Sequence, residues 1–388
     1  MNLSGLEPRK LGASASAHLD LIRAAAAWAV MWGHLRTLFF VDFQHLTQPG
    51  WILKAIYLLT GFGHQAVMVF FVLSGFLISS TVIKSHLAGT WSWLDYGINR
   101  ATRLYVVLIP GLLFGLLWDV LGSSLFATKG IYTHPITDLG SAIARDNLTA
   151  GNFFGNLFYL QTILCSTFGS NGPLWSLANE FWYYVLFPVA LAAVLAWARR
   201  SPLAAIPLTA LAFGLSFFLG LDKLVGFLIW ISGCVLVYAY SRIRLRAKSG
   251  VVAYLLGAAV ILGGCLLSAR AANGAALGSD LAVGIAFTLF LFGILQFEAG
   301  AGSITYTNTT RFFAGFSYSL YVLHFPVLLF LRAWLVPLQR WQPTAANCGL
   351  AILIGALVLS FAWLVSCFTE NKTRVARDWV RRTLVQSR

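Results

Sequence analysis

An arginine and a histidine lie eleven residues apart in an otherwise apolar stretch near the start of the chain. In a helix, Arg23 and His34 would share a face, because eleven residues make about three whole turns and rise about 16 Å. An ionisable group inside a membrane helix is costly and marks a functional site. His34 could act as a general base, and Arg23 could polarise a carbonyl group. The competing interpretation pairs Arg23 with Asp20 at i,i+3 and makes His34 a hydrogen-bonded core residue.

A carboxylate lies in a second apolar segment, GPLWSLANEFWYYVLFP (172–188). Glu180 needs a partner there, because an isolated buried charge is very unfavourable. We expect that partner to be His34, since a carboxylate can orient an imidazole and stabilise its charged form. Trp175 and Ser176 open the segment and are candidate substrate contacts. The alternatives are a structural contact for Glu180 and a plain interfacial belt for the aromatic residues.

A third segment, FSYSLYVLHFP (316–326), is unusually polar for a membrane helix. Tyr318 and His324 are the candidate substrate residues on its polar face. Pro326 is expected to kink the helix and to free a backbone carbonyl. A role in kinking and packing alone is the alternative.

Two arginines, Arg100 and Arg103, are three residues apart at the predicted start of a helix and would share a face beside the membrane. Two guanidinium groups there suit a phosphate-bearing ligand such as a nucleotide or coenzyme A. The alternative is an anchor that obeys the positive-inside rule. The sequence has no Gly-rich phosphate loop, no HExxH and no GxSxG, and it suggests no metal site.

These residues must be positioned by membrane helices. Of the 388 residues, 59% are hydrophobic and only 10% are charged. A soluble domain carries roughly a quarter charged residues, so an all-α integral membrane protein is predicted. Its ten predicted spans are 19–40, 65–83, 104–122, 174–197, 203–220, 224–241, 251–269, 280–297, 312–334 and 345–368. The short apolar stretch 51–63 is predicted to be interfacial or re-entrant, and the small residues Ser74 and Gly75 to pack helices.

The net charge of +14 fits this topology without any nucleic acid. The lysines and arginines gather on alternate loops, which places both termini in the cytoplasm. We predict a cytoplasmic segment at 1–17, one transmembrane domain at 18–371 and a basic cytoplasmic tail at 372–388. The five cysteines are interpreted as small hydrophobic residues.

Five motifs in this order resemble the acyltransferase 3 family of membrane-bound acyltransferases. They are Arg-x10-His (Arg23, His34), FFVLSGFLIS (70–79), RxxR (Arg100, Arg103), WSLxxE (175–180) and SYSLYxxHFP (317–326). The resemblance covers about 18–371. Two positions depart from the family pattern: Val106 stands where proline often follows the RxxR tyrosine, and Lys372 stands in place of the proline of a usual Glu-x-Pro.

The resemblance implies a ten-helix domain in a bacterial inner membrane. It implies an acyl group, acetyl by family habit, that passes from cytoplasmic acyl-CoA to a hydroxyl of a glycan or glycolipid acceptor, with no permanently bound cofactor. Arg23 and His34 would be essential, and Arg100 and Arg103 would serve the donor. A proton-coupled transporter or flippase of a lipid-linked saccharide is the main alternative. A sensor or scaffold without catalysis is the third.

Overall fold

A computed structural model describes residues 8–127, 131–132, 146–245, 247–271, 277–297, 304–336 and 339–386. It divides into two compact units, each built from separated stretches of the chain. Unit 1 comprises Met1–Arg23, His64–Ser92 and Asn179–Arg311. Unit 2 comprises Ala24–Gly63, Trp93–Ala178 and Phe312–Arg388. Residues 1–7 of the predicted N-terminal segment and 387–388 of the predicted tail lie outside the described residues, and the domain boundaries 1–17, 18–371 and 372–388 stay a prediction.

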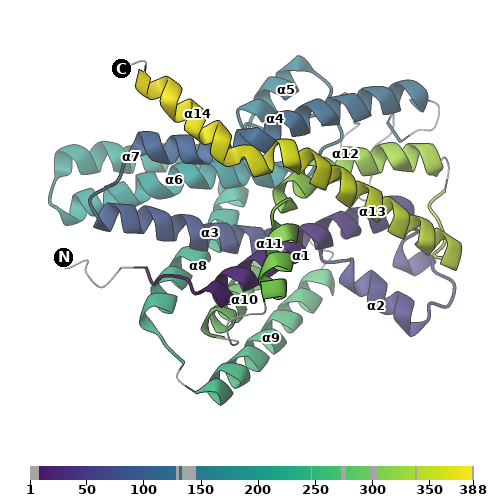
Figure 1. Ribbon diagram of the computed structural model, residues 1–388, viewed down its shortest axis with the longest axis horizontal. Coiled ribbons are helices and arrows are strands. Elements are labelled where there is room, and N and C mark those ends of the chain that lie inside the picture. Colours follow the sequence, from purple (N-terminus) through teal and green to yellow (C-terminus); the bar gives the residue numbers. More distant parts are fainter. Residues whose placement is uncertain are drawn as a thin grey trace. The chain divides into compact units, whose positions relative to one another are not determined.

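Three helices run from one unit into the other: α1 (Ala13–Phe39), α6 (Leu174–Ala198) and α11 (Ile304–Ala314). Unit 1 otherwise holds α3 (Gly63–Leu87), α7 (Pro202–Leu219), α8 (Leu221–Arg242), α9 (Lys248–Ala271) and α10 (Leu277–Gln296). Unit 2 holds α2 (Trp51–Leu59), α4 (Trp93–Leu125), α5 (Ala150–Leu157), α12 (Ser317–Leu335), α13 (Ala345–Phe368) and α14 (Thr373–Gln386). In unit 1, α10 packs against α8 and α9, and in unit 2, α12 packs against α4 and α13 (Figure 1).

The predicted all-α membrane fold is confirmed. Within the described part of the chain, nine helices are long and apolar enough to cross a membrane: α3, α4, α6, α7, α8, α9, α10, α12 and the stretch that begins with α13. The tenth predicted span is α1, which is a continuous helix of 27 residues but carries Asp20, Arg23 and Arg36. The cytoplasmic placement of both termini stays a prediction.

Two helix boundaries differ from the prediction. The helix predicted over 104–122 begins earlier, at Trp93, so Arg100 and Arg103 lie about two turns inside α4 and not at its start. The span predicted over 312–334 is broken, since α11 ends at Ala314 and α12 begins at Ser317. The intervening Gly315 and Phe316 form a turn.

The short apolar stretch and the basic tail both form helices. Residues 51–63 contain α2, whose nine residues are too few to span a bilayer. The tail contains α14, which begins directly after a short 3-10 turn at Glu370–Lys372. One ion pair ties this helix to the start of α4, through Arg381 and Asp95 at 2.9 Å.

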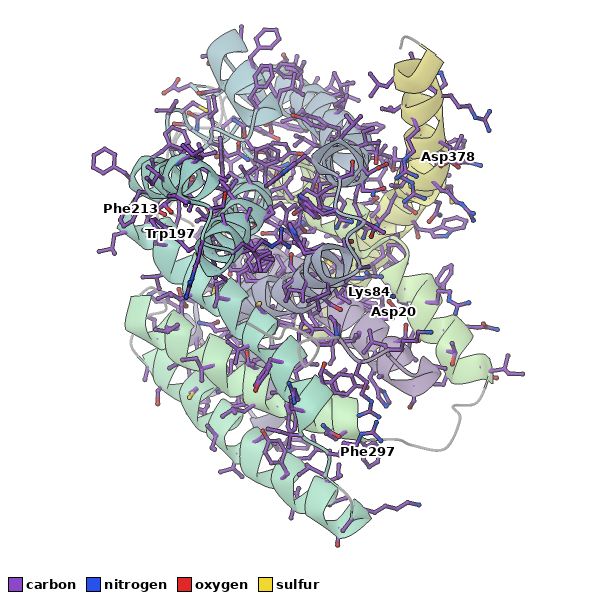
Figure 2. The ribbon with its side chains drawn as sticks, turned by 90° about the vertical axis from the view of Figure 1, so that its left-hand side faces the viewer. Asp20, Lys84, Trp197, Phe213, Phe297 and Asp378 are labelled. Atoms are coloured by element: carbon purple, nitrogen blue, oxygen red, sulfur yellow. The ribbon has the colours of Figure 1, made fainter. Side chains whose placement is uncertain are left out.

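Large apolar side chains remain exposed on the outer helices of unit 1. Phe213 on α7 is 74% exposed, and Trp197 at the end of α6 is 52% exposed. Figure 2 labels both side chains. The indole N–H of Trp197 donates to the Thr209 hydroxyl on α7 at 3.0 Å. Helices that expose so much apolar surface are suited to contact with lipid.

Two glycines let α3 and α8 approach closely within unit 1. A Cβ atom at Gly75 would lie 1.8 Å from the backbone oxygen of Trp230, and one at Gly233 would lie 2.2 Å from the oxygen of Val72. The adjacent Ser74 hydroxyl accepts a hydrogen bond from the Trp230 indole at 3.2 Å. The Ser74–Gly75 notch therefore packs helices, as predicted.

We expect Gly75→Ala to lower the free energy of unfolding by about 3 kcal/mol or more, because two backbones must separate to admit the methyl group. Thermal unfolding of the purified protein in detergent measures the change. Gly257→Ala on α9 is the matched control, since no atom lies within 4 Å of its Cβ position. An unfolding temperature equal to that of the control would contradict the close approach.

Candidate active site

Two histidines from distant parts of the chain meet in unit 2. The Nδ1 atom of His34 on α1 lies 2.8 Å from the Nε2 atom of His324 on α12. The two ring planes are nearly parallel, inclined by 10°, and the ring centroids are 5.0 Å apart. His324 is fully buried, and the edge of Phe325 packs against the His34 ring. The structure thus joins the first and the third of the segments that the sequence singled out.

The hydrogen bonds of this pair assign the tautomer of each ring. Nδ1 of His324 lies 3.0 Å from the Leu320 oxygen and 2.8 Å from the Tyr321 oxygen. Carbonyl oxygens only accept hydrogen bonds, so this Nδ1 carries the proton. A charged imidazole would be costly at a fully buried position, so His324 is neutral and its Nε2 is an acceptor. His34 must then donate from Nδ1, which leaves its Nε2 with a lone pair.

The proline of α12 explains part of this local geometry. Pro326 has no N–H and cannot bond to the carbonyl of Val322, four residues earlier. That carbonyl instead accepts from the Asn171 side chain at 2.9 Å. The predicted release of a backbone carbonyl is therefore confirmed, and it binds the segment before α6 to α12.

A hydroxyl pair makes a second connection between α6 and α12. The Ser176 and Tyr321 oxygens are 2.5 Å apart, and the Tyr321 hydroxyl also donates to the Pro173 oxygen at 3.1 Å. Tyr321 thus connects Ser176 to His324 within unit 2: its hydroxyl contacts Ser176, and its backbone oxygen contacts Nδ1 of His324. Trp175 and Tyr318 are partly exposed in the first turns of α6 and α12. Tyr321 belongs to the polar face of its segment, and that polarity was the sequence signal for it.

The loop between α5 and α6 is held in place by amide side chains. The Asn156 amide donates to the Ser166 oxygen at 2.8 Å, and its own oxygen accepts from the Phe168 N–H at 3.1 Å. The Gln161 amide donates to the Leu174 oxygen at 2.9 Å. Together with Asn171, these contacts fix the entry of α6.

Arg23 and Glu180 belong to unit 1, whereas His34 belongs to unit 2. The Arg23 guanidinium is bonded to Asp20 at 3.0 Å, which is the structural pairing weighed above. The Glu180 carboxylate accepts from the Tyr184 hydroxyl, and the Ser74 hydroxyl donates to the same tyrosine at 3.1 Å. The observed partner of His34 is His324, and the pairing of His34 with Glu180 stays a prediction.

The two arginines of α4 have different partners. The Arg100 guanidinium lies 5.8 Å from the centroid of the Tyr96 ring. The Arg103 guanidinium lies 3.9 Å from Glu370, and its side chain is 42% exposed. Both arginines are therefore open to a ligand only in part, and their role in donor binding stays a prediction.

Glu370 makes buried contacts near the candidate site that the sequence did not reveal. Its carboxylate accepts from the backbone N–H of Ser319 at 2.9 Å and from the Ser319 hydroxyl at 3.0 Å. It thus caps the first turn of α12, where the positive end of the helix dipole favours a carboxylate. The sequence signal was weak, since Glu370 begins the Glu-Asn-Lys that departs from the family pattern. Among the residues that the structure describes, no group of three or more His, Cys, Asp or Glu could hold a metal ion.

The order of these motifs on one membrane chain agrees with a match to known proteins. The family model for an acyltransferase domain, acyltransferase 3, matches residues 16–367. This chain belongs to the acyltransferase 3 family. The matched region of this acyltransferase-family protein contains His34, Glu180 and His324, and it ends just before Glu370. The family and the helices together make it a multi-pass membrane protein.

Two curated proteins are distantly similar to this acyltransferase 3 member. "Nodulation protein 10" of Rhizobium leguminosarum bv. viciae is 25% identical over 193 residues, which cover 48% of this chain and 47% of that protein. The "O-acetyl transferase" of Shigella phage Sf6 is 30% identical over 135 residues, or 34% of this chain and 35% of that protein. The chain thus spans about half and about a third of the length of these relatives. No solved structure matches it.

Proposed function

We propose that this chain transfers an acyl group from cytoplasmic acyl-CoA to a hydroxyl of a glycan or glycolipid, in the inner membrane of a bacterium. The observation that carries the proposal is the 2.8 Å contact between Nδ1 of His34 and Nε2 of His324, from which we infer that Nε2 of His34 is a proton acceptor. Family membership supports the acyl transfer, and similarity to the O-acetyl transferase of Shigella phage Sf6 favours acetyl.

In this mechanism His34 is the general base. Its Nε2 takes the proton of the acceptor hydroxyl while the oxygen attacks the thioester carbonyl. The tetrahedral intermediate then collapses, the C–S bond breaks, and the coenzyme A sulfur leaves with the proton held by His34. Throughout, Nδ1 of His34 donates to the neutral His324, which keeps the ring in one orientation.

The other predicted residues serve the donor and the developing charge. Arg100 and Arg103 bind phosphates of coenzyme A, as guanidinium groups bind phosphate oxygens through paired hydrogen bonds. Arg23 guides the donor or polarises its carbonyl group. We propose that Glu180 is an acidic residue of the catalytic site. Trp175, Ser176 and Tyr318 are proposed to contact the acceptor.

The first test is acyl transfer by the purified full-length protein in lipid nanodiscs. We expect labelled acetyl-CoA to lose its acetyl group to a surface glycan, and glycans from producing cells to gain the mass of one acyl unit. Glycans of unchanged mass, together with proton-dependent movement of a lipid-linked saccharide that needs no acyl-CoA, would favour the transporter instead.

We expect Arg100→Gln to raise KM for acetyl-CoA by roughly tenfold, because one charge-assisted hydrogen bond to phosphate is lost. Arg100 is a cleaner test than Arg103, which is also linked to Glu370. Initial rates at varied acetyl-CoA concentrations measure the effect. Arg244→Gln, which removes an exposed arginine outside any helix, is the control. If both variants keep the wild-type KM, Arg100 is a topological anchor.

A further inference from the structure

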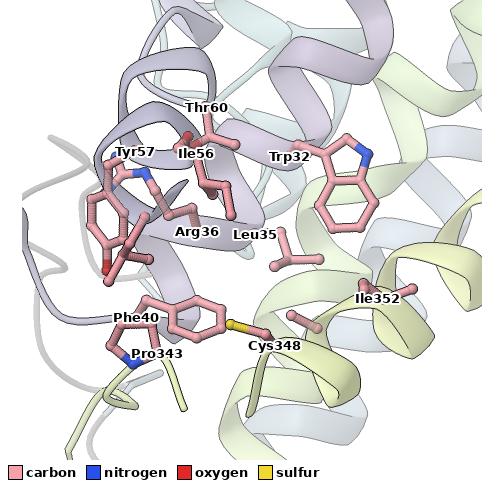
Figure 3. Close-up of a pocket in the computed structure, with 12 residues that line it drawn as sticks. Trp32, Leu35, Arg36, Phe40, Ile56, Tyr57, Thr60, Pro343, Cys348 and Ile352 are labelled. Atoms are coloured by element: carbon pink, nitrogen blue, oxygen red, sulfur yellow. The ribbon is translucent and has the colours of Figure 1, made fainter. Parts of the chain in front are cut away.

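A pocket of about 150 Å³ lies within unit 2. Figure 3 shows the residues that line it. Three elements form its walls: the last turns of α1, the short helix α2, and the start of α13 with the chain before it. Its lining is aromatic and aliphatic, and includes Trp32, Leu35, Phe40, Ile56, Ala351 and Ile352. Apolar cavities of about this size stay dry and admit small apolar groups. The pocket is therefore suited to a segment of hydrocarbon.

One wall of the pocket belongs to a helix whose other side is apolar and exposed. Trp51 is 78% exposed and Leu59 is 68% exposed at the two ends of α2. This helix is too short to cross a bilayer, and a tryptophan at its end is typical of the membrane interface. The exposed side of α2 is thus fitted to lipid, and its opposite side, which includes Ile56, lines the pocket.

Positive charge gathers at the same end of α1. Arg332 donates to the Leu38 oxygen at 2.8 Å, and Arg340 donates to the Thr37 oxygen at 3.2 Å. These two arginines therefore bind the last carbonyls of α1, where the helix dipole favours cations. Arg340 also forms an ion pair with Asp42.

A third arginine, Arg36, is part of the pocket wall itself. Its guanidinium lies 5.1 Å from the centroid of the Tyr57 ring and donates to the Thr37 hydroxyl at 3.0 Å. Burial raises the pKa of the Tyr57 phenol, which stays neutral and donates to the Val41 oxygen at 2.8 Å. The pocket thus combines an apolar interior with a cationic edge.

We propose that this pocket holds part of one hydrocarbon chain of an anionic phospholipid, with the lipid phosphate bound by Arg36. An apolar chain joined to a phosphate has the two chemical properties that the pocket and its edge complement. Binding of this lipid does not depend on acyl transfer, so the inference stands apart from the proposed function.

Native mass spectrometry of the full-length protein, released from nanodiscs of equal phosphatidylglycerol and phosphatidylcholine, tests the inference. We expect wild type to retain phosphatidylglycerol in preference, and Arg36→Gln to retain about tenfold less of it. Ile56→Trp should fill the pocket and reduce bound lipid of both kinds. The matched controls are Leu59→Trp, an exposed position on the same helix outside the pocket, and Arg244→Gln; both should retain lipid as wild type does.

A second measurement separates lost binding from lost folding. Added phosphatidylglycerol should raise the Tm of the delipidated wild type, because a ligand of the folded state stabilises it, and should not raise that of Arg36→Gln. Equal retention and equal Tm shifts in Arg36→Gln, Ile56→Trp and wild type would overturn the proposal. Retention of phosphatidylcholine equal to phosphatidylglycerol, or displacement of phosphatidylglycerol by an equal amount of polyprenyl phosphate, would overturn the choice of lipid.

Discussion

His34→Gln should lower kcat for acyl transfer by about 10²- to 10⁴-fold, the range that a positioned general base contributes. Glutamine is close to histidine in size, and its amide can still donate to Nε2 of His324. The packing of α1 against α12 is therefore kept, while the proton acceptor is lost. The acceptor hydroxyl would have to attack the thioester without a base.

Single-turnover release of coenzyme A, followed by chromatography, measures this effect. We expect KM for acetyl-CoA to change by less than about threefold, because the proposed donor contacts are elsewhere on the chain. Leu59→Trp, an exposed substitution in the same unit, controls for disturbance of the membrane domain. Acyl transfer by His34→Gln at the wild-type rate would remove His34 from the mechanism.

The second large effect is expected at His324, for which we propose a positioning role through its hydrogen bond to His34. His324→Phe keeps a planar ring but removes the acceptor for the Nδ1–H of His34. The His34 ring can then rotate or change tautomer, so we expect kcat to fall by about 10²-fold. The loss is smaller than that of His34→Gln, because a base is still present.

A conservative variant distinguishes positioning from packing. His324→Gln restores an acceptor oxygen, and we expect it to recover about tenfold of the lost kcat. Its Tm and that of His324→Phe, measured in the same detergent, show whether either change weakens the fold. If phenylalanine is as active as glutamine at this position, the bond between the two histidines has no part in orienting the base.

The sequence predicted the membrane helices well because an apolar run of about twenty residues rarely forms anything other than a membrane helix. It did not predict the break between α11 and α12, because residues 312–334 are long enough to cross a membrane as one helix. The start of α12 is fixed by Glu370, which lies 51 residues beyond Ser319 in the chain. A helix cap made by so distant a residue leaves no local pattern.

The partner of His34 could not be predicted from the sequence, for a related reason. Helical geometry gives the face of a residue on its own helix and its depth along the span, but not its neighbours on other helices. Depth is one coordinate of three, and helices at one level can lie on different sides of a domain. The observed partner, His324, is 290 residues from His34 in the chain.

The loop before α6 is held in place by hydrogen bonds from amide side chains, and this affects how the enzyme responds to salt. Bonds from Asn156, Gln161 and Asn171 to backbone oxygens join neutral groups, so dissolved ions barely screen them. Exposed ion pairs behave differently, because the Debye length falls from about 10 Å at 0.1 M salt to about 3 Å at 1 M. Inhibition by concentrated salt would then report weakened binding of the proposed donor, acyl-CoA, while this loop keeps its conformation.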